Sequence, residues 1–353
     1  MNDLLVLGLV IIILYDIQIM KPFSTLNEDY LSLESCNSFR GIFALVVVFH
    51  HLAQRTSGGV LFHLFTHVGY LAVAVFFFYS GYGLMKKHMS SPGYYEKFLL
   101  NRIPSILLPY LVITVIYWLY YAGTGKVYSA RQMMISTFLK GLPIVSFSWY
   151  IIAILLSYIA FWLLMVLFKK HYDRMVMSAC LLNLLYILFC RRLGYGSYWY
   201  NTAFAFCVGI FWAHKESDIL ELLQKHFPIS ATSVILFWMI CILGTFVVKK
   251  SVIRFALQIL SSCLFSIIIV LFSMKFRIRS KIAHFLGTIS LELYLVQGLP
   301  IMMFRNKVIY IQNELLWCSI VLLSSIALAV VFHALFSKML TYYRKALTKQ
   351  GVT

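Results

Sequence analysis

Charged residues are scarce in this chain, and acidic residues are the scarcest. Charged side chains make up 12% of the 353 residues, with 12 Asp and Glu against 30 Lys and Arg. A soluble globular chain carries about 25% charged and about 45–50% apolar residues, whereas this chain is 61% hydrophobic. The shortage of charge therefore excludes an ordinary soluble globular domain.

Metal-ligand spacings and strand-like alternation are also missing. None of the seven cysteines stands in a CxxC pair or a similar spacing, which excludes a zinc site and a disulfide framework. His63 and His67 are four residues apart, a spacing that can bind metal, but no third ligand accompanies them and we expect no metal. The apolar segments do not alternate with period two, which excludes a transmembrane β-barrel.

The chain instead contains long apolar blocks bounded by charged or turn-forming clusters. A bilayer core about 30 Å thick needs about 20 helical residues to cross. We therefore predict an all-α protein, a polytopic transmembrane helical bundle of about ten to eleven membrane-spanning helices. Asp16 interrupts the first block, so the sequence leaves open whether this block spans the membrane. The blocks are 4–20, 39–55, 61–85, 103–122, 147–168, 175–190, 198–213, 229–248, 252–273, 283–304 and 315–340.

The net charge of +18 would suggest nucleic acid as a partner of a soluble protein. Here the basic residues lie in short loops between apolar blocks, a placement typical of membrane orientation, so we expect the lipid bilayer and no nucleic acid as partner. About 17 basic residues fall on one side and about 11 on the other. The more basic side should be cytoplasmic, and it includes the C-terminus.

The block 39–55 carries ionisable residues, which are costly at bilayer depth and usually functional. Arg40 and His51 are eleven residues apart, almost three helical turns, so they share one face about 16 Å apart along the axis, while His50 points about 80° away. Arginine can bind phosphate or carboxylate, and a neutral histidine can take a proton from a hydroxyl. The pair suits transfer of an acyl group from a phosphate-bearing donor to an alcohol. The structural alternative is that Arg40 reaches the interface and His51 only bonds a neighbouring helix.

Other polar positions follow later in the chain. Arg102 stands at the cytoplasmic entrance of its block, where it either marks the inner side or holds an anionic donor. Glu292 is the one acidic residue inside the block 283–304, and it should face a cavity or a basic partner. Tyr294 and Gln297 add hydrogen-bonding capacity to the same block.

Five short patterns occur in a fixed order between about residues 35 and 340. In these patterns the chain resembles the membrane-bound acyltransferase 3 family. The residues that carry the resemblance are Arg40-Gly41 with His51; Gly69, Phe77, Phe78, Ser80 and Gly81; Arg102 with Pro109-Tyr110; Ser148-Trp149-Tyr150; and Ser290, Glu292, Tyr294 and Leu295.

The resemblance implies an enzyme, an acyltransferase for groups other than amino-acyl groups, in the plasma membrane of a bacterium. It implies that an acyl group, usually acetyl, passes from cytoplasmic acyl-CoA to a hydroxyl of a cell-envelope or exported carbohydrate or glycolipid. His51 and Arg40 would then be catalytic. Arg102 and Ser80 would bind CoA. The substrate would be bound by Trp149, Glu292 and Gln297.

The chain departs from the family pattern in two places. Gln297 stands where the late pattern commonly has a histidine, so no proton transfer is expected there. An additional hydrophobic helix and short loop, residues 1–34, precede the expected acyltransferase domain, 35–345, and a cytoplasmic tail, 346–353, follows it. A transporter or exporter of lipid-linked or polymeric sugar is the alternative, because multi-helix bundles with intramembrane charges are common there.

Overall fold

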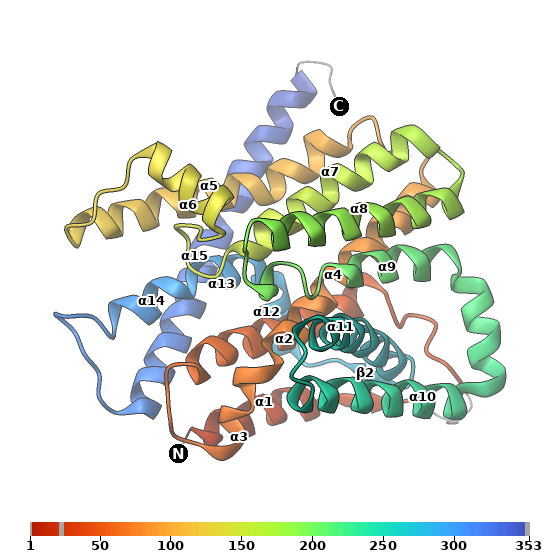
Figure 1. Cartoon of the computed structure of the whole chain (residues 1–353), viewed down its shortest axis with the longest axis horizontal. Coiled ribbons are helices and arrows are strands. Elements are labelled where there is room, and N and C mark those ends of the chain that lie inside the picture. Colours follow the sequence, from red (N-terminus) through yellow and green to blue (C-terminus); the bar gives the residue numbers. More distant parts are fainter. Residues whose placement is uncertain (1, 21–24, 350–353) are drawn as a thin grey trace.

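The computed structural model describes residues 2–20 and 25–349, which form a helical bundle with one small two-stranded sheet (Figure 1). The elements in chain order are α1 Asp3–Leu14, β1 Ile17–Ile19, α2 Leu33–Ala53, α3 Val60–His63, α4 Phe65–Ser90, α5 Phe98–Gly123, α6 Ala130–Lys140, α7 Trp149–Phe168, α8 Tyr172–Arg192, η1 Ser197–Trp199, α9 Phe204–His214, α10 Glu216–Val247, α11 Ser251–Ser273, β2 Phe276–Ile278, α12 Lys281–Thr288, α13 Ser290–Val296, α14 Gly298–Met303 and α15 Glu314–Lys349.

Within the described residues, eight helices are long and apolar enough to cross a membrane, or nine if the pair Lys281–Thr288 and Ser290–Met303, bent by 64°, is one span. The all-α polytopic class predicted from the sequence is thereby confirmed. The number of spans is lower than the expected ten to eleven, because the blocks 4–20 and 198–213 form helices of 12 and 11 residues. At 1.5 Å per residue these helices measure about 18 and about 16 Å, short of a bilayer core of about 30 Å.

Helices α2 and α4 lie at the centre of the bundle. In their most apolar windows 78% of the α2 residues and 67% of the α4 residues are buried, against 11–39% in the other six long helices. Figure 1 shows α5, α7 and α8 on one side of this centre and α1, α10 and α11 on the other. Polar side chains on α2 are therefore surrounded by protein rather than by lipid.

The first hydrophobic block forms a short helix followed by a strand. At the start of α1, the Asp3 carboxylate accepts a hydrogen bond from the Phe62 backbone N–H at 2.8 Å. After α1, strand β1 pairs antiparallel with β2, with Ile17 opposite Ile278. The block thus connects α3 with the segment after α11.

The two ends of the bundle are named here by the α2 residue nearer to each. Helix α2 begins after Ser32, whose side chain accepts the Ser35 N–H at 3.2 Å, and runs from the Arg40 end to the His51 end. Helix α15 begins at the His51 end, where Glu314 accepts a hydrogen bond from the Ser57 N–H, and returns to the Arg40 end. It continues to Lys349, so residues 346–349 of the expected tail extend this helix, and 350–353 lie outside the described residues.

Candidate active site

A cavity of about 620 Å³ opens between α2, α4, α5, α7 and α13, towards the Arg40 end. We call it the central cavity. Three different helices, α2, α4 and α5, bring Arg40, Ser80 and Arg102 to its wall. These are three of the residues that the sequence analysis singles out. The other polar residues on the wall include Lys87, Tyr150, Tyr158, Ser290 and Tyr294.

The central cavity is lined by positive charge. Arg40, Lys87 and Arg102 contribute three cations, and no acidic side chain is among the described residues that line it. A negatively charged ligand is favoured in this cavity, because the three cations repel one another in a partly buried space where solvent screens them little. The cavity is therefore suited to an anionic ligand.

The two arginines of the cavity are held by neutral partners. Arg40 donates a hydrogen bond to the Asn37 side-chain oxygen at 2.9 Å, and its Nε is buried without a partner in the described part of the chain. Arg102 donates from Nε to the Tyr94 hydroxyl at 3.1 Å. Because neither guanidinium is neutralised by a carboxylate within these residues, both keep donors for a ligand.

Ser80, on α4, also lines the cavity. The Tyr158 hydroxyl donates to the Ser80 hydroxyl at 3.4 Å, which orients both groups. Seven residues after Ser80, two turns along α4, Lys87 lines the same cavity. In the sequence Lys87 is one of the basic residues that indicate membrane orientation, although helical spacing also places it on the same face as Ser80.

His51 is buried and is not among the residues that line the central cavity. Its side chain is 8% exposed, and its ring stacks on Phe147 with centroids 3.7 Å apart and an interplanar angle of 16°. Its Nδ1 atom has no hydrogen-bond partner among the described residues. An unpaired buried imidazole nitrogen is costly, which marks this position as one where a further group is expected to bind.

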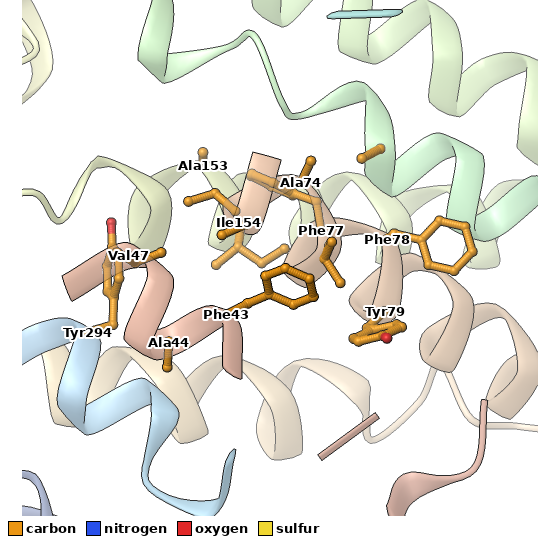
Figure 2. Close-up of a cluster of buried hydrophobic side chains, with 14 of the residues drawn as sticks. Phe43, Ala44, Val47, Ala74, Phe77, Phe78, Tyr79, Ala153, Ile154 and Tyr294 are labelled. Atoms are coloured by element: carbon orange, nitrogen blue, oxygen red, sulfur yellow. The ribbon is translucent and has the colours of Figure 1, made fainter. Parts of the chain in front are cut away.

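Phe147 and Tyr294 connect His51 with the central cavity. Phe147 has a φ of 67°, a costly conformation for a non-glycine residue, and its carbonyl accepts a hydrogen bond from the Tyr294 hydroxyl. Tyr294 lines the cavity. Figure 2 shows Tyr294 in one buried cluster with Val47, which precedes His51 by one turn of α2. The sequence offered no local signal for Phe147, because its contact with His51 arises between distant segments.

The structure separates the two adjacent histidines of α2. His50 places Nδ1 at 2.8 Å from the Phe65 carbonyl and Nε2 at 3.0 Å from the Gln54 amide. Both nitrogens of His50 thus have partners close by, whereas Nδ1 of His51 does not. His50 is thereby occupied with packing against the start of α4.

The three expected substrate-binding residues lie off the cavity wall. The Glu292 carboxylate is 3.1 Å from Nδ1 of His333 on α15, a basic partner of the kind expected. Gln297 is fully buried and donates to the Tyr294 carbonyl at 3.1 Å. Trp149 is buried at the start of α7 and packs edge-on against Tyr150, which does line the cavity. Their substrate roles stay predictions.

The site combines a cationic cavity with a buried imidazole inside a polytopic helical bundle, and this combination defines a membrane protein that can bind an anionic ligand beside a proton acceptor. The family model for the acyltransferase 3 family, described as an acyltransferase domain, matches residues 33–334. The chain therefore belongs to this family and is a membrane acyltransferase for groups other than amino-acyl groups. Comparisons with curated proteins and with solved structures gave no match.

Proposed function

We propose that the protein is an O-acyltransferase that moves an acyl group, acetyl in the first instance, from acyl-CoA to a hydroxyl of a cell-envelope or exported carbohydrate. The observation that carries the proposal is the central cavity with its three cations and no acidic residue among the described lining residues. Coenzyme A carries several phosphate groups, and arginine binds phosphate through paired, charge-assisted hydrogen bonds. Arg40, Lys87 and Arg102 suit these phosphates.

His51 is proposed to act on the acceptor. Its unpaired nitrogen takes the proton of the acceptor hydroxyl while the hydroxyl oxygen attacks the thioester carbonyl. The new ester C–O bond forms, the C–S bond breaks, and the leaving thiolate of CoA receives the proton from His51. Arg40 lies on the same stripe of α2, about 16 Å away along the axis, which is a separation suited to contact with the CoA portion rather than the acyl carbon.

The Arg40 end of the bundle is proposed to face the cytoplasm. The loops at this end and the C-terminal part of α15 carry the larger share of the basic residues, as positive-inside orientation requires. The central cavity then opens to the compartment that contains acyl-CoA. His51 lies nearer the opposite end, from which an envelope carbohydrate would approach, so donor and acceptor would reach the imidazole from opposite sides.

The direct test uses membranes that contain the protein. Incubation with acetyl-CoA labelled in the acetyl group is expected to transfer label to carbohydrate, and the His51→Ala protein serves as the blank. A deletion strain is expected to export the same glycan without its acetyl groups. If the deletion strain fails to export the glycan at all, the sugar-exporter interpretation replaces this one.

Replacing Arg102 with Ala is expected to raise the KM for acyl-CoA about tenfold or more with a smaller change in kcat. The reason is the loss of hydrogen bonds to a charged group, each of which contributes about 1.5–3 kcal/mol. Steady-state kinetics at varied acetyl-CoA measure the effect, and Lys170→Ala, which alters an exposed cation at the same end, is the control. Equal KM values for the two variants would remove Arg102 from the donor site.

A further inference from the structure

A second pair of arginines lies at the His51 end, away from the central cavity. Arg55 follows His51 by four residues, two positions beyond the end of α2, and so lies about 6 Å further out along the helix direction. Its backbone N–H bonds the Leu52 carbonyl at 2.9 Å, which carries the turn beyond the end of α2. Arg305, in the loop between α14 and α15, donates to the Arg55 carbonyl at 2.7 Å.

Arg305 is held rigidly in this position. Its Nε donates to the Ile311 carbonyl at 3.3 Å, and its guanidinium lies 4.1 Å from the centre of the Trp317 ring and 5.7 Å from that of Tyr310. Stacking of this kind orients a guanidinium at little further entropic cost when a ligand binds. The remaining donors of Arg305 are therefore positioned before any ligand arrives.

The two arginines of this pair form no ion pair within the described residues. Neither guanidinium has an ion pair there, and the partly exposed Arg55 guanidinium makes no hydrogen bond there. The nearby Glu314 carboxylate interacts electrostatically with Arg305, but its hydrogen bonds come from the Ser57 and Gly58 backbone N–H groups at 2.9 and 2.8 Å. Partial burial and then the nearby Arg305 charge lower the pKa of Arg55, as expected for a cation that lacks a counter-ion.

We propose that Arg55 and Arg305 form a binding site for a phosphoryl group beside His51, and that this group belongs to the acceptor of the acyl transfer. Two guanidiniums at adjoining positions match the oxygens of a phosphate or diphosphate. The acceptor is then a phosphorylated or lipid-diphosphate-linked sugar, whose hydroxyl reaches His51 while its phosphate rests about one helical turn further out. The inference rests on the proposed function, and a membrane-lipid headgroup offers the same chemistry and is the competing source.

The test uses the full-length protein in phosphatidylcholine nanodiscs, with acetyl-CoA as donor and the glycan fraction of the native membranes as acceptor. Arg55→Gln and Arg305→Gln are expected to raise the KM for the acceptor at least tenfold and to leave the KM for acetyl-CoA within twofold. Lys307→Gln, which removes an exposed cation two residues from Arg305, is expected to change neither value beyond twofold. Unchanged acceptor KM values in both arginine variants would overturn the proposal.

Two further measurements separate the sources of the phosphoryl group and keep the test valid if one variant misfolds. Repeating the kinetics with phosphatidylglycerol added to the nanodiscs separates the sources, since a loss seen only with the anionic lipid assigns the site to a headgroup and overturns the acceptor assignment. Arg55→Gln removes no hydrogen bond of the described residues and should fold even if Arg305→Gln does not. If the wild-type protein transfers no acetyl group, the proposed function fails, and inorganic diphosphate then tests the site itself. It should raise the unfolding temperature of the wild type but not of Arg55→Gln, and equal shifts would overturn the site.

Discussion

His51→Ala is expected to abolish acyl transfer, with kcat falling by about 10²–10⁴-fold, the usual contribution of a positioned general base. The physical reason is that His51 shares a helical face with Arg40 and carries a buried nitrogen that has no hydrogen-bond partner among the described residues. His50→Ala is expected to retain a substantial part of the activity, since His50 bonds the Phe65 carbonyl and Gln54. Transfer of labelled acetyl groups to glycan measures both variants.

The adjacent histidines make a matched pair, because both substitutions remove an imidazole from the same turn of α2. The unfolding temperature of the detergent-solubilised protein and its affinity for CoA should change little in His51→Ala, since the Phe147 ring loses only one stacking partner. His51→Gln, which keeps a hydrogen-bonding side chain but cannot shuttle a proton, should be as inactive as His51→Ala. Full activity in all three variants would refute a catalytic role for the imidazole.

Gly81→Val is expected to prevent accumulation of folded protein. A Cβ atom at Gly81 would lie 2.1 Å from the Phe206 carbonyl oxygen on α9, and one at Gly209 of α9 would lie 2.2 Å from the Phe78 carbonyl oxygen on α4. Each clash is with backbone rather than with a movable side chain, so α4 and α9 would have to separate. Overpacking costs about 1–3 kcal/mol even where side chains can yield, and more is expected here.

The control for this prediction is Gly83→Val, two residues further along the same helix, where a Cβ atom would have no heavy atom within 4 Å. Fluorescence-detected size-exclusion chromatography of tagged protein gives the folded yield of both variants. Gly81→Val should lose most of its monodisperse peak, and Gly83→Val should keep it. Similar yields would mean that α4 and α9 do not cross as closely as the structure places them.

The hydrophobic blocks predicted the eight long helices, but they could not predict that other blocks form short elements. The block 198–213 becomes η1 and the 11-residue α9, and the block 283–304 becomes three short helices, α12, α13 and α14. Hydrophobicity reports only that a segment avoids water. It does not distinguish a crossing helix from a short helix buried in protein, because both environments are apolar.

The sequence by itself determined that the chain is a polytopic helical membrane protein and that Arg40 and His51 share a helical face, because hydrophobic length and helical repeat are local properties of the chain. Only the tertiary structure decided that Arg40, Ser80 and Arg102 line one cavity, that Phe147 covers His51, and that Glu292 pairs with His333. These groupings join residues tens to hundreds of positions apart. They depend on which helices pack together, and in an apolar medium that choice is made by close contacts such as the one between α4 and α9.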